Sequence, residues 1–350
     1  MSEFDRVIDR RGGDSLKWNR YAGRDVLPLW VADMDFAAPP AVLEALRARV
    51  AHGVFGYSEA WPSLTESVLA HLECLYGWKG VETLITSTPV YPPFLTAPGH
   101  MGRKLRRIDL VEKEGLWQWD WQALEKEAPH SRLLLLCHPH NPVGRCWQDE
   151  ELEKLAVLAE QHDWIVCSDE IHCDLILDEG KQHRPFARLG EKAAQRSITL
   201  MAPSKTFNVP GLACAFAVIP DAGLRRRFQA AMAGIVPHPN TLGLVACEAA
   251  FRHGAGWHQK LIKVLRSNRD RVEQAVAALP GLRMAHVEAT YLAWIDARGL
   301  GVDDPEKHFE AHGLGLSDGA AFGAPGWVRL NFGCPAATLK EALARLEKAC

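Results

Sequence analysis

The sequence predicts an α/β protein with a mostly parallel, doubly wound sheet in a large domain and a smaller α+β domain. Between residues 103 and 220, short apolar runs alternate with amphipathic helical patterns, which is typical of βαβ units around a buried parallel sheet. After about residue 236 the pattern changes to a long helical stretch and then to alternating strands. We expect a large domain over residues 41–240, and a small domain formed by residues 1–40 and 241–350.

The N-terminal part contributes an apolar segment, two helices and a turn. Residues 26–36 are the apolar segment, and residues 41–50 have apolar side chains at helical spacing directly after two prolines. Residues 53–57 predict a glycine-flanked turn that presents Tyr57. Residues 62–78 predict a second amphipathic helix, with a proline near its start and a glycine near its end.

The rest of the chain supplies the two sheets. In the large domain we expect strands at residues 103–110, 131–145, 164–172, 197–201 and 212–220, and helices at residues 120–128 and 149–163. In the C-terminal part we expect a helical stretch over residues 240–279 and strands within residues 281–297 and 327–333.

Composition excludes several classes of function. With 350 residues, 47% hydrophobic and 24% charged, the chain resembles an ordinary soluble globular protein of two domains. A net charge of −3 excludes the basic surface that nucleic acids or anionic membranes require. No apolar run approaches the roughly 18 residues of a spanning helix. The partner is therefore expected to be a small molecule, with neither nucleic acid nor membrane involved.

The nine cysteines indicate a reducing compartment. They are scattered and odd in number, and no two are spaced as C-x-x-C. This usage argues against a disulfide framework and against a zinc site, so we expect no metal and a cytoplasmic protein.

Polar side chains follow three predicted strands at the points where the strands end. Asn141, Asp169 and Lys205 each occupy such a position, and the carboxyl ends of parallel strands are where open α/β sheets bind ligands. Taken singly, the asparagine fits a turn cap, the aspartate a helix start and the lysine a solvated loop. A buried carboxylate needs a cation, and a crowded lysine suits Schiff-base chemistry, so their joint occurrence favours an active site.

The motifs around these residues resemble a known family. HNPVGR, SDEIHCDL, APSKTFNVPGL and VRLNFGCP are similar to the fold-type-I pyridoxal 5′-phosphate (PLP) enzymes of the class I/II aminotransferase superfamily. WVADMDF, GVFGY, TPVYPPF and EATYLAWID resemble its MalY/PatB-type branch, the cystathionine β-lyases or C–S lyases. The likeness extends from about residue 30 to residue 335, and it implies the PLP-transferase fold type I.

The resemblance implies a role for each matching residue. Lys205 would bind PLP covalently and move the substrate's Cα proton, while Asp169 would pair with the protonated pyridine nitrogen. The other implied cofactor contacts are Asn141 and His172 at the ring's phenolic oxygen, Tyr91 stacked on the ring, and Ser204 and the neighbouring subunit's Tyr57 at the phosphate. Arg329 would bind the substrate carboxylate. Asp33 and Tyr291 would lie near the entrance, although a turn cap and a core aromatic fit them equally well.

The implied reaction is α,β-elimination in a homodimer with shared active sites. Cystathionine or a related cysteine S-conjugate would yield pyruvate, ammonia and a thiol. An aminotransferase is an alternative, because it uses the same lysine.

The sequence departs from the family pattern near residues 79–88. The family places a strand, a phosphate-binding turn and a helix here, and about 35 residues, the size of one βα unit, are absent. A catalytically impaired regulatory homologue that has lost its phosphate-binding segment is therefore the third interpretation.

Overall fold

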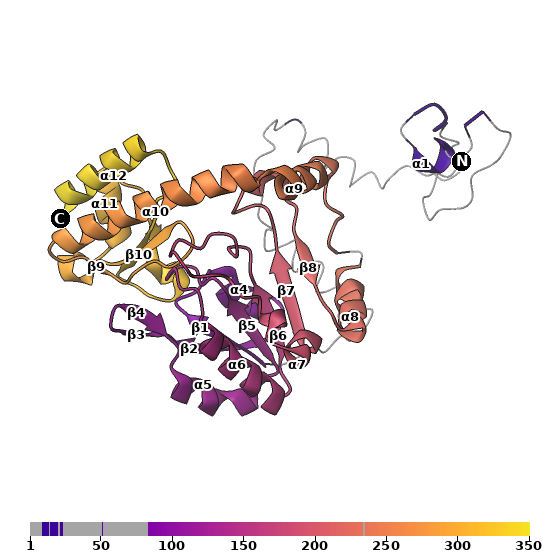
Figure 1. Cartoon of the computed structure of the whole chain (residues 1–350), viewed down its shortest axis with the longest axis horizontal. Coiled ribbons are helices and arrows are strands. Elements are labelled where there is room, and N and C mark those ends of the chain that lie inside the picture. Colours follow the sequence, from indigo (N-terminus) through magenta and orange to yellow (C-terminus); the bar gives the residue numbers. More distant parts are fainter. Residues whose placement is uncertain (1–8, 14, 20–21, 24–50, 52–82, 234) are drawn as a thin grey trace. The chain divides into compact units, whose positions relative to one another are not determined.

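A six-stranded sheet carries the larger part of the protein. The computed structural model describes residues 9–13, 15–19, 22–23, 51, 83–233 and 235–350. The strands run in the order β2 (Lys104–Asp109), β1 (Thr83–Thr88), β5 (Leu133–Cys137), β6 (Ile165–Asp169), β7 (Ser197–Met201) and β8 (Phe216–Val218) (Figure 1). All neighbours are parallel except β7 and β8, so the mostly parallel sheet expected from the sequence is present.

Helices follow the strands of this sheet along the chain. They are α4 (Pro93–His100), α5 (Trp121–Glu127), α6 (Asp149–Gln161), α7 (Glu191–Gln195) and α8 (Ala222–Met232), with short 3-10 turns at Ala128–His130, Phe186–Arg188 and Pro210–Leu212. The leucines of α6 repeat at helical spacing and are buried, and a capping box between Gln148 and Glu151 fixes its start. A hairpin of β3 (Val111–Lys113) and β4 (Leu116–Gln118) follows β2.

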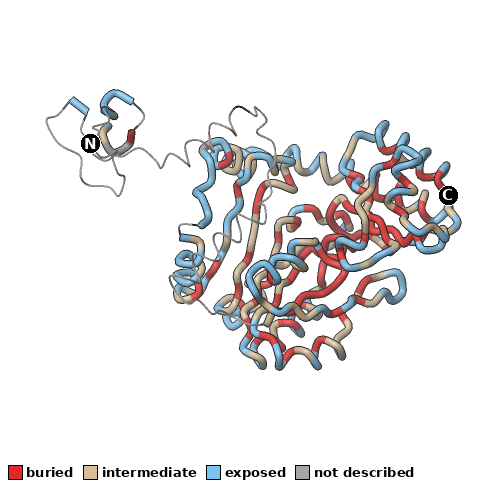
Figure 2. Tube along the Cα trace, turned by 180° about the vertical axis from the view of Figure 1, so that it is seen from behind, coloured by how far each residue is buried: buried red, intermediate tan, exposed pale blue. Residues whose placement is uncertain are grey.

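The C-terminal part forms a second, antiparallel sheet. Its strand order is β11 (Ser317–Asp318), β12 (Trp327–Asn331), β10 (Leu292–Asp296) and β9 (Arg283–Met284). Its helices are α9 (Thr241–His253), α10 (Ala255–Ala278), α11 (Pro305–Ala311) and α12 (Ala336–Ala349), with 3-10 turns at Arg298–Leu300 and Gly319–Phe322. Buried residues concentrate along the strands of both sheets (Figure 2).

Residues 1–59 and residues 60–350 are two separate compact units. In the first, α1 (Leu16–Asn19) begins after Ser15, whose hydroxyl accepts a hydrogen bond from the Trp18 amide. The expected elements at residues 26–36, 41–50, 53–57 and 62–78 lie outside the described residues. The division into domains at residues 40 and 240 stays a prediction. No helix in the described part of the chain is long and apolar enough to cross a membrane.

Several predicted elements are shorter than their sequence patterns. Residues 131–145 form a strand that ends at Cys137 and is followed by the Pro/Asn/Gly turn that the sequence predicts, whereas the strand expected over residues 212–220 shrinks to Phe216–Val218. A left-handed residue, Ala213, follows a 3-10 turn there and delays the strand. The stretch over residues 240–279 is two helices that meet at Gly254. A Cβ on Gly254 would lie 2.3 Å from the Phe207 ring, so the close packing of this ring requires glycine.

The described part of residues 79–88 forms a strand inside the sheet. This strand, β1, is almost fully buried and pairs with β2 on one side and β5 on the other. At the opposite edge of the sheet, β8 leaves the Phe216 and Val218 side chains exposed. Loss of a βα unit would uncover apolar side chains of the sheet, and the exposed Phe216 and Val218 side chains agree with such a loss. The absence of the unit itself stays a prediction.

Candidate active site

A cavity of about 170 Å³ lies where the carboxyl ends of the parallel strands meet the second sheet. It is lined by Tyr91, Cys137, Asn141, Asp169, Ile171, His172, Lys205, Tyr291, Leu292, Arg329 and Asn331. The large sheet supplies the first seven of these from the ends of its strands and the turns that follow them, and β10, β12 and the residue before β10 supply the rest. Parallel strands end at a common edge, which is why residues far apart in sequence converge here.

Asn141 is fixed in a tight turn between β5 and α6. The Tyr91 amide donates to the Asn141 carbonyl oxygen at 3.0 Å, and Arg329 Nη1 donates to Asn141 Oδ1 at 3.0 Å. Gly144 makes this turn possible, since its φ is +72° and a Cβ would lie 2.7 Å from Val287 Cγ1. The turn therefore positions the Asn141 side chain at the cavity and ties it to both sheets.

Asp169 ends β6 with its carboxyl group shielded from bulk water. Desolvation raises the pKa of Asp169 to about 6, although the Ile171 amide and the Lys205 ammonium both lower it. The Ile171 amide donates to Asp169 Oδ1 at 3.2 Å. A carboxylate with this environment gains stability from any cation that enters the cavity.

Lys205 lies in the turn that follows β7, as the sequence predicts. Its ammonium is near His172, a fully buried residue whose pKa falls to about 3 because of burial first and then the positive charges of Lys205 and Arg329. His172 is therefore a neutral imidazole at physiological pH. Its ring meets Tyr291 edge-on at 6.1 Å between centroids, and its Nδ1 has no hydrogen-bond partner among the described residues.

Arg329 projects from β12 and closes the other side of the cavity. Its guanidinium lies over the Phe322 ring at 4.6 Å, and Nη2 donates to Ser317 Oγ at 3.4 Å. Burial lowers the pKa of Arg329, but a guanidinium stays charged in proteins. Two cations, Lys205 and Arg329, thus face one carboxylate, which leaves the cavity ready for an anionic group.

The structure brings together seven of the residues singled out from the sequence: Lys205, Asp169, Asn141, His172, Tyr91, Arg329 and Tyr291. Ser204 is not among the lining residues, and Asp33 and Tyr57 lie outside the described part of the chain. Sequence reasoning missed Cys137 and Asn331, which also line the cavity. Cys137 is the last residue of the apolar run in a predicted parallel strand, and this position alone would have indicated that it lies at the ligand-binding edge of the sheet.

The arrangement suits a cofactor with a protonated heterocyclic nitrogen and a carbonyl group. The Asp169 carboxylate can pair with the nitrogen, and the Lys205 amine can condense with the carbonyl. The unpartnered His172 Nδ1 and the Asn141 amide are available to a ring oxygen. The described residues thus fit the ring end of such a cofactor.

The chain is similar to several known proteins over nearly its whole length. Residues 61–346 match the family model for aminotransferase class I and II. Cystathionine β-lyase PatB of Bacillus subtilis (strain 168) is 36% identical, with 99% of each chain covered. The solved structure of OvoB is 46% identical with a TM-score of 0.75, covering 99% of this chain and 98% of that one. Cystalysin from Treponema denticola, described as containing PLP, is 32% identical with a TM-score of 0.74, covering 98% and 97%.

The alignment with PatB also bears on the length of this chain. It runs over 388 positions, whereas this chain has 350 residues, so PatB carries residues that have no counterpart here. A difference of this kind is what the absent βα unit would produce.

Proposed function

This chain belongs to the aminotransferase class I and II family, and we propose that it is a PLP-dependent carbon–sulfur β-lyase. Its substrate is cystathionine or a related cysteine S-conjugate, which it converts by α,β-elimination to pyruvate, ammonia and a thiol. The observation that carries this proposal is the cavity that Lys205, Asp169 and Arg329 line together. The 36% identity to cystathionine β-lyase PatB over nearly the whole chain supports the reaction type.

Each residue of the cavity has a defined task in this reaction. PLP, when bound, supplies an electron sink for the charge that develops at the substrate's Cα. Lys205 would hold the cofactor until the substrate amine displaces it, and its freed Nζ would then carry the Cα proton. The Asp169 carboxylate would keep the ring nitrogen protonated. Asn141 and neutral His172 hold the ring oxygen, and Tyr91 covers the ring face. Tyr291 stands at the entrance beside Arg329, and Asp33 is assigned to the same region.

At the phosphate end we assign Ser204 and, from a second subunit, Tyr57. Ser204 directly precedes the cofactor lysine, which supports its assignment. Phosphate binding without the family's usual turn is then the weakest part of the site. PLP affinity of the purified protein therefore tests the impaired-homologue interpretation, since a chain that binds no PLP at saturating concentration cannot be the lyase.

The products distinguish the lyase from an aminotransferase. Incubation with PLP and cystathionine is expected to release pyruvate, ammonia and a thiol in equal amounts, without an added keto acid. A requirement for a keto acid acceptor, together with formation of a new amino acid, would identify the chain as an aminotransferase instead.

Replacing Arg329 with lysine is expected to weaken substrate binding. The lysine keeps the charge but loses the paired hydrogen bonds to the substrate carboxylate, each worth about 1.5–3 kcal/mol. The KM for the amino acid should therefore rise by about ten- to a hundredfold, and PLP absorbance should be unchanged. Steady-state kinetics of Arg329→Lys check this, with Arg298→Lys as the matched control because Arg298 pairs with Asp296 outside the cavity. An unchanged KM for Arg329→Lys contradicts the assignment.

We further propose a cytoplasmic homodimer with shared active sites. Exposed apolar side chains on α9 and α10, including Phe251 and Trp257, support an interface close to the Lys205 turn, because both rings pack against Phe207. Eight free cysteines in the described residues support a reducing compartment. Sedimentation analysis decides the assembly, and a monomer with full activity would rule out shared sites.

A further inference from the structure

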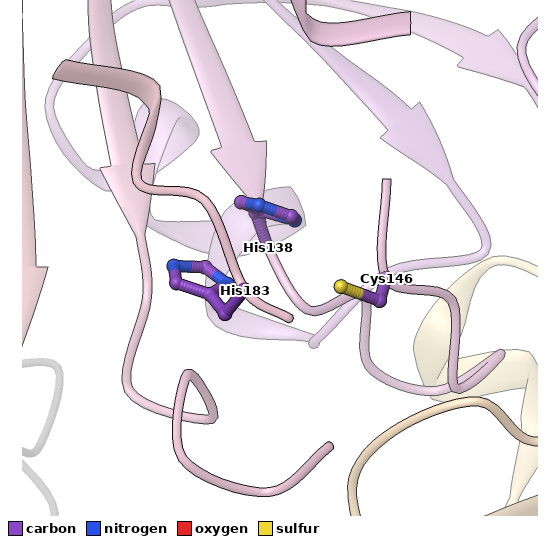
Figure 3. Close-up of side chains that lie close together, drawn as sticks. All are labelled: His138, Cys146 and His183. Atoms are coloured by element: carbon purple, nitrogen blue, oxygen red, sulfur yellow. The ribbon is translucent and has the colours of Figure 1, made fainter. Parts of the chain in front are cut away.

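Three side chains outside the active site form a compact cluster. His138, Cys146 and His183 have ligand atoms that all lie within 4.8 Å of one another (Figure 3). His138 follows β5, Cys146 ends the turn that holds Asn141, and His183 lies in the loop before the 3-10 turn Phe186–Arg188. His138 and Cys146 are buried, and the His183 side chain is only 7% exposed. None of them lines the active-site cavity.

Hydrogen bonds place a proton on one nitrogen of each imidazole and favour the tautomer with a free Nδ1. His138 Nε2 lies 3.1 Å from the Arg184 carbonyl oxygen, and His183 Nε2 lies 2.7 Å from Glu170 Oε2. A carbonyl or carboxylate oxygen accepts, so each Nε2 carries the proton and each Nδ1 keeps its lone pair. Neither Nδ1 has a hydrogen-bond partner in the described part of the chain, and both atoms are buried. Two buried lone pairs without a donor are costly and call for an electrophile.

The surroundings hold the three side chains in place. Buried Glu170, which orients His183, also accepts from Ser168 Oγ at 2.8 Å and from the Phe186 amide at 3.0 Å. The His138 amide donates to the Asp169 carbonyl oxygen at 2.9 Å, and the Cys146 amide donates to Glu288 Oε2 at 2.9 Å. These bonds fix the backbone of the cluster and the Nε2 side of the His183 ring.

We propose that His138 Nδ1, His183 Nδ1 and Cys146 Sγ form a binding site for a borderline-soft divalent metal ion, Zn²⁺ in the first place. Two imidazoles and a thiolate are ligands that Zn²⁺ prefers, and three protein ligands leave a fourth position for water. The hydrogen bonds from each Nε2 to a carbonyl or carboxylate are those that metal-bound histidines typically make. Zn–N bonds of about 2.0–2.1 Å and Zn–S bonds of about 2.3 Å separate ligand atoms by about 3.3–3.6 Å, so the ligand atoms must close by up to roughly an ångström. The imidazole rings, whose centroids are 4.3 Å apart and whose planes are inclined by 31°, must also turn so that both Nδ1 lone pairs meet the ion.

The site is accessible and adjoins the catalytic residues. His183 also lines an open groove of about 650 Å³, which gives an ion a path to the cluster. A bound ion would join the turn that carries Asn141 to the loop at residues 178–185. It would also release the Cys146 proton, because only a thiolate binds the metal, and burial raises the pKa of this thiol to about 12.

Cobalt binding tests the proposal on the full-length, PLP-loaded protein. Co²⁺ replaces Zn²⁺ at such sites and gives visible ligand-field bands at longer wavelengths than PLP absorbs. We expect one Co²⁺ per chain with the intense bands of a tetrahedral, thiolate-bound ion. Cys146→Ala should abolish them, and His183→Gln should weaken binding at least about tenfold. The matched control Cys167→Ala removes a half-buried thiol that is not part of the cluster and should leave the bands intact.

Two outcomes overturn the proposal. One is the absence of thiolate-type bands in the unmodified protein, which would mean that Cys146 does not bind the ion. The other is the persistence of the bands in Cys146→Ala. Should the variants fail to fold, X-ray absorption of the Zn²⁺-loaded unmodified protein decides the question without them. One sulfur at about 2.3 Å with two nitrogens at about 2.0–2.1 Å supports the site, and coordination without sulfur refutes it.

Discussion

Replacing Lys205 with alanine is expected to abolish lyase activity and the absorption band of the lysine-bound cofactor. Lys205 is the described amine beside Asp169 in the cavity, and alanine can neither condense with the cofactor's carbonyl nor carry a proton. Loss of the proton carrier alone costs about 10²–10⁴-fold in turnover, and loss of the covalent attachment adds to this. Turnover and the absorption spectrum, with and without borohydride reduction, measure both effects.

A surface lysine provides the control for this experiment. Lys192 pairs with Glu160 on the outside of the protein, and Lys192→Ala should keep both the band and the activity. If Lys205→Ala retained a band that borohydride fixes to the protein, another amine would be the attachment point. That result would also show that Lys205 is not the equivalent of the cofactor-binding lysine of the family.

Replacing Asp169 with asparagine is expected to lower turnover strongly while stabilising the PLP-free protein. Asparagine keeps the shape but cannot hold the ring nitrogen protonated, so turnover should fall by about 10²–10³-fold. The same change removes a carboxylate whose pKa is raised from 3.8 to about 6 by desolvation. At pH 7 that ionised group costs the folded state on the order of 2–3 kcal/mol, which asparagine avoids.

The stability advantage of Asp169→Asn is expected to increase with pH. A carboxyl group whose pKa is raised by folding binds its proton more tightly in the folded state. The cost of ionising it is therefore absent below about pH 4 and complete above about pH 6. Thermal unfolding of the PLP-free proteins should show a larger advantage for Asp169→Asn at pH 7 than at pH 5. The exposed control Asp163→Asn should change neither stability nor turnover. Near-normal turnover of Asp169→Asn would remove this residue from the site.

Asp169, which is expected to favour turnover but to lower the stability of the PLP-free protein, lies close to the cluster of His138, Cys146 and His183. Asp169 and Glu170 are neighbours in sequence but serve different places, since one carboxylate faces the cavity and the other holds His183. The strand places successive side chains on opposite sides, so a single β6 terminus supports two functions. A backbone hydrogen bond between the His138 amide and the Asp169 carbonyl oxygen, 2.9 Å long, joins the two places.

The sequence by itself determined the alternation of strands and helices and the convergence of Asn141, Asp169 and Lys205. Hydrophobic periodicity is local, and parallel strands must end at one edge, so both follow without knowledge of packing. It also predicted that β12 carries a cavity residue, Arg329, but only through the family resemblance. Residues 1–82 lie almost wholly outside the described structure, so the assignments of Asp33 and Tyr57 stay predictions.

Only the tertiary structure showed which side chains from distant parts of the sequence lie together. The expectation of no metal site relied on short cysteine spacings, whereas His138, Cys146 and His183 are brought together by a turn and a distant loop. The need for glycine at position 254 arises from its close contact with Phe207, and the neutral state of His172 arises from burial beside two cations. Each of these is set by groups remote in sequence. Close packing and the desolvation of charges depend on what surrounds a residue in space, and no local pattern records those neighbours.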